Sequence, residues 1–233
     1  MKKSKRCHDK FYLKEKVRNK PKESFKFIFK HIDGSLNEKK ILDVGCANGD
    51  FLYFLNKKFP KSHLYGSDID KELIFYAKKQ VPSIKKIFKF DITKKNLIDE
   101  KFDVIFMNGV HSIFDTCEEW VENLINLMKN HKSKIYVFGI WNPYDLDVIL
   151  RAKKTFEFEW EQGWNLHSKK TISRLIKKTN YQHRFHDFNI NINIKRRSED
   201  LFRSWTMKLK NNQNLITNGT GIIHYYSLLK IFK

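Results

Sequence analysis

The sequence predicts an α/β fold built on a doubly wound, mostly parallel β-sheet. Two observations carry this prediction. Strand-sized apolar segments alternate with amphipathic helical segments over residues 40–141, and this alternation is typical of parallel strands joined by right-handed helical crossovers. The first apolar segment also leads directly into a glycine-containing turn that precedes a helix, as at the nucleoside site of such sheets.

A polar, lysine-rich arm precedes the sheet. Residues 1–22 contain the aromatic pair Phe11 and Tyr12, and an amphipathic helix is expected over Glu23–Ile32. We interpret residues 1–37 as a basic arm and helix, which act either as a lid over a site or as a solvated tail. No apolar segment follows the basic residues Met1–Lys5, so a secretory signal is not expected.

The central elements are expected to be short and regular. Asp70 is placed to cap the second crossover helix, and Thr116 with Glu119 forms a capping-box pattern before the third. The predicted strands are Lys40–Cys46, His63–Ile69, Ile84–Ile92, Phe102–Asn108 and Ser133–Trp141, and the predicted helices are Asp50–Lys58, Lys71–Lys79 and Cys117–His131.

The C-terminal part is less regular. Ser168 is expected to cap a helix, and the Asn-Pro-Tyr segment at residues 142–144 is a turn signal. The Asn-rich stretch Asn211–Asn218 is interpreted as a hairpin loop. The remaining predicted elements are a helix over Lys169–Thr179 and strands over Tyr181–Ile194, Arg203–Lys208 and Gly221–Phe232.

Charge is distributed unevenly along the chain. The formal net charge is +20, yet residues 41–150 hold as many acidic as basic side chains, so the flanks carry the excess. A basic flank favours a nucleic-acid or phosphate-bearing partner. Lysine far outnumbers arginine, however, which favours compositional drift, because nucleic-acid readers use arginine for bidentate contacts.

Three cysteines, Cys7, Cys46 and Cys117, have neither disulfide-framework nor metal-ligand spacing. They predict a reduced, cytoplasmic protein without a metal site. No apolar run reaches the roughly 18 residues that a membrane span needs.

The most informative segment runs from Ile41 to Asp50 and reads ILDVGCANGD. Gly45 and Gly49 allow the backbone to pass close to a ligand. Asp68 follows Gly49 by 19 residues, at the end of the second predicted strand. This is the spacing at which a carboxylate accepts hydrogen bonds from a ribose diol, so the segment predicts a nucleoside-cofactor site.

The stretch LDVGCANGDFLYFL resembles the first motif of class I S-adenosylmethionine-dependent methyltransferases, with Ala47 where that family usually has its middle glycine. The similarity continues at residues 65–70, 89–92 and 102–111 and covers about residues 38–140. It implies a Rossmann-like, mostly parallel seven-stranded sheet with an antiparallel C-terminal strand and an N-terminal helical arm. It also implies S-adenosyl-L-methionine as the cofactor.

The resemblance assigns cofactor contacts residue by residue. The acid of the first motif and the glycine turn would bracket the amino-acid moiety, and the acid ending the second strand would hold the ribose hydroxyls. The residues ending the third strand would meet adenine, and those ending the fourth would lie near the sulfonium. Cys46 is interpreted as packing. The implied set is Asp43, Gly45, Cys46, Ala47, Gly49, Asp68, Ile69, Asp91, Ile92, Asn108 and Gly109.

The methyl acceptor has to be inferred from residues after the fourth strand. His111 lies at the carboxyl edge of the sheet and is the first candidate for a general base, and His167 and Asp145 are the second and third. The Asn/Asp-Pro-Pro-aromatic signature of amino-group methylation is missing after that strand. Residues 142–168 and 195–220 are interpreted as acceptor-side insertions in a methyltransferase domain over residues 38–233.

Aromatic residues and turns in this region suggest the acceptor class. Trp141, Tyr144 and Trp164 are candidates for an aromatic wall. The Asn-Pro turn, the GWN segment and the NGTG hairpin resemble methyltransferases that decorate bacterial surface glycans. We therefore expect O-methylation of a sugar, nucleotide-linked or phosphorylated small molecule for capsule or lipopolysaccharide biosynthesis. The alternatives are an RNA or tRNA methyltransferase and a non-catalytic protein with the cofactor fold.

Overall fold

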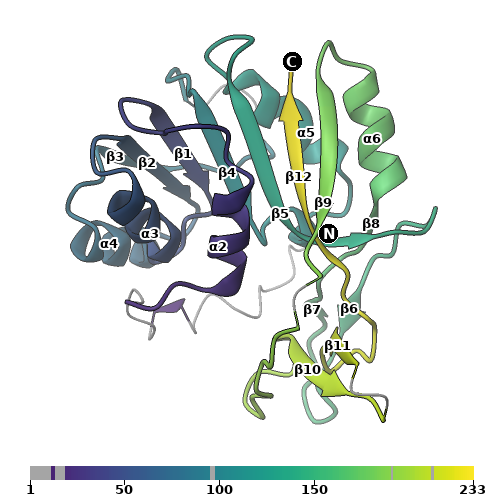
Figure 1. Cartoon of the computed structure of the whole chain (residues 1–233). Coiled ribbons are helices and arrows are strands. Elements are labelled where there is room, and N and C mark those ends of the chain that lie inside the picture. The colour runs from purple at the N-terminus through teal and green to yellow at the C-terminus, as the bar shows by residue number, and fades with distance from the viewer. Residues whose placement is uncertain (1–11, 14–18, 95–97, 190, 211–212) are drawn as a thin grey trace.

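The computed structural model describes residues 12–13, 19–94, 98–189, 191–210 and 213–233. Its main sheet has the strand order β3-β2-β1-β4-β5-β12-β9, and the first five of these strands run parallel. β12 is antiparallel to both of its neighbours (Figure 1). The predicted doubly wound sheet with an antiparallel C-terminal strand is therefore confirmed. The strands are β1 (Lys40–Val44), β2 (His63–Asp68), β3 (Lys86–Lys89), β4 (Val104–Asn108), β5 (Lys134–Asn142), β9 (Gln182–Asp187) and β12 (Tyr226–Phe232).

Helices cover both faces of the sheet (Figure 1). α2 and α3 pack against one face through a cluster that includes Phe25, Leu55 and Phe106. α5 and α6 pack against the other face through a cluster that includes Trp120 and Ile172. Both faces are buried, which is why the parallel strands read as continuous apolar runs. The helices are α2 (Glu23–Lys30), α3 (Asp50–Lys58), α4 (Lys71–Gln80), α5 (Glu118–Asn126) and α6 (Lys169–Lys177).

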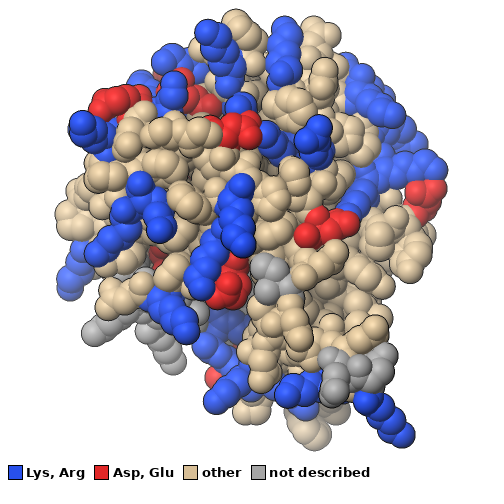
Figure 2. Space-filling view, viewed as in Figure 1, with Lys and Arg blue, Asp and Glu red and all other residues tan. Residues whose placement is uncertain are grey.

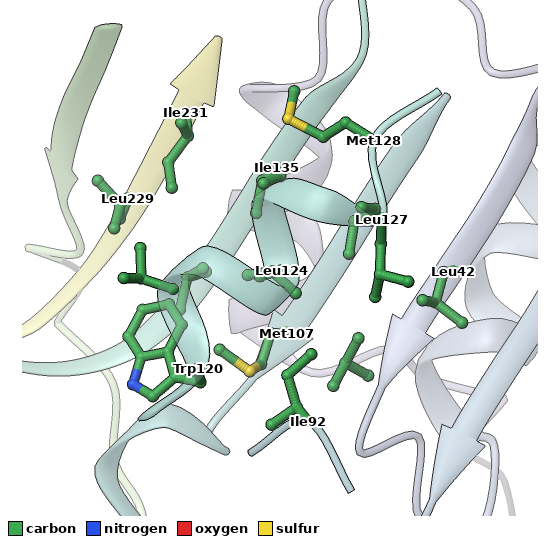
Figure 3. Close-up of a cluster of buried hydrophobic side chains, with 14 of the residues drawn as sticks. Leu42, Ile92, Met107, Trp120, Leu124, Leu127, Met128, Ile135, Leu229 and Ile231 are labelled. Atoms are coloured by element: carbon green, nitrogen blue, oxygen red, sulfur yellow. The ribbon is translucent and has the colours of Figure 1, made fainter. Parts of the chain in front are cut away.

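Figure 3 shows the core between α5 and the sheet. Trp120, Leu124 and Leu127 lie opposite Met107 of β4 and Leu229 of β12, and all five side chains are buried. The apolar stripe that predicts this helix is therefore the stripe that packs on the strands.

Side-chain caps begin α4 and α6 where the sequence places them, and one hydrogen bond of the predicted capping box forms ahead of α5. Asp70 Oδ1 accepts the backbone N–H groups of the second and third residues of α4 at 2.7 and 3.2 Å. Ser168 Oγ accepts a backbone N–H from the first turn of α6 at 3.1 Å. Glu119 Oε1 accepts the backbone N–H of Thr116 at 3.0 Å.

The helix predicted over residues 117–131 ends earlier, at Asn126. Met128 forms an isolated parallel β-bridge with Phe102, and the backbone N–H of Lys129 donates to the Phe102 carbonyl at 2.9 Å. These contacts tie the chain to the start of β4, so the last apolar residues of the pattern pack outside the helix.

Two short hairpins extend beyond the carboxyl end of β5 (Figure 1). The predicted strand over residues 203–208 is β10 (Trp205–Lys208), which pairs with β11 (Asn214–Thr217) in a separate two-stranded sheet. Four residues of the expected loop over Asn211–Asn218 are therefore strand. The second hairpin pairs β6 (Arg151–Ala152) with β7 (Glu161–Gln162).

The C-terminal strands of the main sheet are shorter than predicted. β9 ends at Asp187 and β12 begins at Tyr226, so residues 188–189, 191–194 and 221–225 follow an irregular path beside the hairpins. A short strand, β8 (His167–Ser168), pairs with the end of β5. Within the described part of the chain, no helix has the length and hydropathy to cross a bilayer.

Candidate functional site

A cavity opens at the carboxyl ends of β1, β2 and β4, where the strand order reverses. This is the position at which doubly wound sheets bind ligands. We call it the glycine-loop cavity. Of the predicted cofactor residues, Gly49 alone does not line this cavity. The residues that line it are Asp43, Gly45, Cys46, Ala47, Asp68, Ile69, Asp91, Ile92, Asn108 and Gly109.

Gly49 has a structural role instead. It precedes the first residue of α3 with a φ of 85°, and a side chain there would face Ala77 and Val81. The structure therefore corrects its placement among the ligand-facing residues.

The loop between β1 and α3 is held in one conformation by hydrogen bonds from its backbone to the end of β2. Gly45 has a φ of 71°, and a Cβ atom there would overlap the Val110 side chain. The N–H groups of Gly45 and Cys46 both donate to the carbonyl of Ser67, at 2.8 and 2.9 Å. The N–H of Ala47 donates to Asp68 Oδ2 at 3.0 Å. The glycine turn and the end of β2 therefore form one rigid cradle.

The floor of the glycine-loop cavity is acidic. Asp43 is buried, and burial together with the nearby Asp68 carboxylate raises the pKa of its carboxyl well above the usual value. Asn108 Nδ2 donates to Asp43 Oδ1 at 3.5 Å. The cation of Lys22 opposes this pKa shift and lies 3.2 Å from Asp50 Oδ2. A bound group with a positive charge would stabilise this carboxyl pair.

The nucleoside side of the cavity combines polar and apolar surfaces. Asp68 Oδ1 accepts the N–H of Asp70 at 3.0 Å, which fixes the carboxylate at the mouth of β2. Ile69 is 37% exposed and offers an apolar surface beside it. Asp91 Oδ1 accepts both the N–H and the hydroxyl of Thr93, at 3.1 and 2.8 Å. This arrangement can hold a ribose at one end and a planar base at the other.

Cys46 lines the cavity as a packed thiol. Its side chain is buried, and burial raises the pKa of the thiol well above its ordinary value. A thiol held in its neutral form is a poor nucleophile. Among the described residues, no cluster of His, Cys, Asp and Glu is arranged to hold a metal ion.

His111 lies outside the cavity, contrary to its interpretation as a general base. It begins a short 3-10 helix, its side chain is fully buried, and its ring stacks on Trp141 at 4.1 Å between centroids. Nε2 lies 3.0 Å from the carbonyl of Ile140. Burial lowers the pKa of His111 to about 3. The ring occupies the space that a side chain at Gly139 would take, so His111 packs against β5.

The other two base candidates are also away from the cavity. His167 is buried in β8, and its Nε2 lies 3.0 Å from the carbonyl of Phe114. Asp145 is exposed and forms an ion pair with Lys170. Neither residue lines the cavity, so the structure corrects both assignments.

Only one member of the expected aromatic wall reaches the site. Trp164 lines the cavity, and its Nε1 donates to the carbonyl of Phe202 at 3.0 Å. Trp141 is fully buried beneath His111, and Tyr144 is 67% exposed.

A second cavity adjoins the first and is bounded by β5, β12 and the segment that leads into β10. We call it the hairpin cavity. Tyr12, Lys22, Gly109 and Trp164 line both cavities, so a molecule in the hairpin cavity lies next to one in the glycine-loop cavity. Its other walls include Phe138, Phe188, Ile192, Ile194, Lys195, Arg197, Arg203, Ser204, Ile216 and Tyr226.

Sequence reasoning missed the polar residues of the hairpin cavity. Ser204 Oγ lies 3.0 Å from His224 Nδ1 and 2.9 Å from Tyr226 Oη. His224 and Tyr226 are two residues apart, the spacing that places side chains on one face of an extended segment, and this was the available signal. Ser204 is distant in sequence, so no local pattern connects it to them.

Comparison with known proteins agrees with the geometry of the glycine-loop cavity. Residues 42–131 match the family model described as a methyltransferase domain. This span begins within β1, includes the glycine turn and runs through β4 and α5. It confirms the resemblance to methyltransferases drawn from the same residues.

Two curated relatives match about half of the chain. A putative methyltransferase 235L of Invertebrate iridescent virus 6 is 31% identical over 44% of this chain and 38% of its own length. A malonyl-[acyl-carrier protein] O-methyltransferase of Bacillus cereus is 26% identical over 53% of this chain and 44% of its own length. The chain thus spans less than half the length of these relatives.

A solved structure extends the likeness to most of the chain. Magnesium protoporphyrin IX methyltransferase from Synechocystis PCC 6803, crystallised with bound S-adenosylmethionine, has a TM-score of 0.53 at 12% identity. The match covers 96% of this chain and 78% of that protein. At this identity the likeness shows the shared fold.

Proposed function

We propose that this chain is an S-adenosylmethionine-dependent methyltransferase that modifies a small molecule bound in the hairpin cavity. One observation carries the proposal: the glycine turn, Asp43 and Asp68 converge on a single cavity at the reversal point of the sheet. The methyltransferase-domain match over residues 42–131 and the relatives named as methyltransferases support it.

The residues of the glycine-loop cavity fit this cofactor. Gly45 lines the cavity, and the carboxyl of Asp43 suits the ammonium group of the amino-acid moiety of the cofactor. We assign Asp68 to the ribose hydroxyls and Ile69 to the adenine face, because both residues line the same cavity as Asp43. The cofactor supplies an activated methyl group on a sulfonium centre, so the protein has mainly to align the acceptor with it.

Transfer to an oxygen atom is the reaction we infer. The curated relative from Bacillus cereus is named an O-methyltransferase. The described walls of the hairpin cavity offer hydroxyl and guanidinium groups that can orient an oxygen acceptor. A sugar acceptor, a role in capsule or lipopolysaccharide biosynthesis, and a cytoplasmic location remain predictions from the sequence.

Calorimetry with S-adenosylhomocysteine tests the cofactor assignment. The wild-type chain is expected to bind S-adenosylhomocysteine and to show no comparable affinity for NAD⁺, because the turn lacks the G-x-G-x-x-G pattern that accommodates a pyrophosphate. Asp145→Ala is the matched control, since that carboxylate lies away from the cavity. Absence of S-adenosylhomocysteine binding would support the non-catalytic alternative.

RNA methylation is the second candidate, favoured by the net charge of +20. Figure 2 shows Lys and Arg side chains spread over the visible face, with Asp and Glu between them. Filter binding of bulk RNA across a salt series separates the two. RNA is favoured over a small molecule if binding is tight and the logarithm of the binding constant falls by several units for each tenfold increase in salt concentration.

A further inference from the structure

We propose that the acceptor is a carboxylic acid with an apolar body, and that its carboxylate oxygen receives the methyl group. The inference rests on the proposed function, because it names the substrate class of the same site. Its support comes from the hairpin cavity: the basic side chains, the hydroxyl groups and the apolar side chains that line it.

The lining of the hairpin cavity holds more basic than acidic side chains. Lys195, Arg197 and Arg203 line it from the segment that leads into β10, and Lys22 lines it from the side of α2, against the carboxylates of Glu23 and Asp200. Asp200 Oδ1 accepts the backbone N–H of Arg203 at 3.2 Å, which orders the turn that carries this side chain. A guanidinium group matches a carboxylate with two parallel hydrogen bonds.

A row of hydrogen-bonding groups ends at the wall of the same cavity. Ser204 Oγ lies between His224 Nδ1 and Tyr226 Oη, at 3.0 and 2.9 Å. His224 is buried, and burial lowers its pKa to about 4, so the ring is neutral at pH 7. Burial also raises the pKa of Tyr226, which keeps its hydroxyl protonated.

These protonation states give the row a direction. When Nδ1–H of His224 donates to Ser204 and the Ser204 hydroxyl donates to Tyr226, the O–H of Tyr226 can donate into the cavity. The Tyr226 hydroxyl then donates at the end of a chain of hydrogen bonds from His224 and Ser204. Such a chain strengthens the last donor, which suits an anionic acceptor.

Part of the remaining wall is apolar. Phe138, Phe188, Ile192 and Ile194 line the same cavity as the basic side chains and the hydroxyl groups. This surface suits a hydrocarbon or aromatic body attached to the acid, because such a body removes apolar area from water.

A carboxylate also suits the chemistry of the site. The acid is ionised at pH 7, so no base has to remove a proton, and the described residues that line the cavity include no histidine. The carboxylate oxygen forms a bond to the methyl carbon as the carbon–sulfur bond breaks, and the sulfur keeps the electron pair. The products are a methyl ester and S-adenosylhomocysteine, without release of a proton. The negative charge of the carboxylate and the positive charge of the sulfonium both disappear in this step. A cavity screened from water favours that loss of charge.

The first experiment measures binding without methyl transfer. The complex with S-adenosylhomocysteine is titrated with 3-phenylpropionate and with the matched alcohol 3-phenylpropanol. The acid is expected to bind at least about tenfold more tightly. Equal affinity, or no binding of either compound, would overturn the carboxylate assignment.

Paired arginine substitutions locate the effect. Arg203→Gln is expected to weaken binding of the acid about tenfold or more and to leave the alcohol unchanged. Arg196→Gln is the control, because the Arg196 side chain stacks on Trp205 at 5.0 Å and does not line the cavity. An equal loss in both variants would contradict a specific carboxylate contact.

The second experiment identifies the methylated atom. The protein is incubated with methyl-tritiated S-adenosylmethionine and a small-molecule extract of its source cells. Label is expected in products that release volatile methanol in alkali, as methyl esters do and methyl ethers do not. Alkali-stable label, or no labelled product from a protein that binds S-adenosylhomocysteine, overturns this inference alone. Failure to bind S-adenosylhomocysteine overturns the proposed function.

Discussion

The two carboxylate oxygens of Asp68 have separate partners. Oδ2 accepts the N–H of Ala47 and Oδ1 accepts the N–H of Asp70, each at 3.0 Å. Asp68→Ala therefore removes both the proposed ribose contact and the tie that holds the glycine turn. Binding of S-adenosylhomocysteine is expected to weaken by about 1.5–3 kcal/mol. Calorimetry measures this change, and an unchanged affinity would place the ribose elsewhere.

Burial of His111 makes stability depend on pH. The pKa falls from 6.5 to about 3 in the folded chain, so the unfolded chain binds a proton that the folded chain excludes. The free energy of unfolding is expected to fall as pH decreases from 6.5 toward 3, by at most about 1.4 kcal/mol per pH unit for this group. Above pH 6.5 the group has no such effect. Urea unfolding over pH 4–7 measures the slope.

His111→Phe isolates this contribution, because Phe keeps an aromatic ring against Trp141 and cannot titrate. The free energy of unfolding of the variant is expected to depend less steeply on pH. Part of the pH dependence that remains comes from His224, whose pKa is also lowered. Affinity for S-adenosylhomocysteine is expected to stay within a few-fold, since His111 does not line the glycine-loop cavity. An identical slope would mean that the ring is not desolvated.

Local spacing was enough to predict residues that line the glycine-loop cavity, and it was insufficient to place His111. Asp43, Gly45 and Asp68 follow directly from strand ends, whose positions are set by short-range patterns. The place of His111 depends on Gly139, which lies 28 residues away in sequence and leaves room for the ring. Contacts of this kind form only when β5 pairs with β4, so the sequence pattern does not reveal them.

The turn between β1 and α3 tolerates only glycine at its first position. Gly45→Ala would combine an unfavourable backbone conformation with overlap of the Val110 side chain. It is expected to lower the free energy of unfolding by about 1–3 kcal/mol and to weaken S-adenosylhomocysteine binding. Thermal unfolding and calorimetry measure the two effects.

Two further variants separate the causes of that loss. Gly34→Ala has a similar φ, 69°, with no atom near the added methyl group, and reports the backbone cost alone. The double variant Gly45→Ala/Val110→Ala is expected to recover the part due to overlap. A double variant no more stable than Gly45→Ala would show that overlap is unimportant.

Elements with strong local signals were predicted well, and those set by tertiary pairing were not. The capped helices α4 and α6 begin where the sequence places them. The strand over residues 203–208 exists, yet it pairs with β11 and not with the main sheet. An alternating pattern predicts which face of a strand is buried, but it does not predict which other strand will pair with it.

The N-terminal arm is the part of the molecule that could close the site. Tyr12 lines both cavities, and Tyr53 Oη donates to Asn19 Oδ1 at 3.4 Å, while Phe11 lies outside the described residues. Deletion of residues 1–21 is expected to reduce turnover and to leave the unfolding midpoint nearly unchanged. Tyr12→Ala is the matched point variant. Full activity of both variants would identify the arm as a solvated tail.

The position of Trp164 has a consequence for how the affinities of the two cavities depend on each other. Its ring forms part of both cavities, and its Nε1 donates to the carbonyl of Phe202 near β10. A ligand that fixes this ring in one cavity changes the free energy of occupying the other. Such coupling is reciprocal: the factor by which the cofactor changes acceptor affinity equals the factor by which the acceptor changes cofactor affinity. A shared wall of this kind makes the coupling between cofactor binding and acceptor binding a property of the fold.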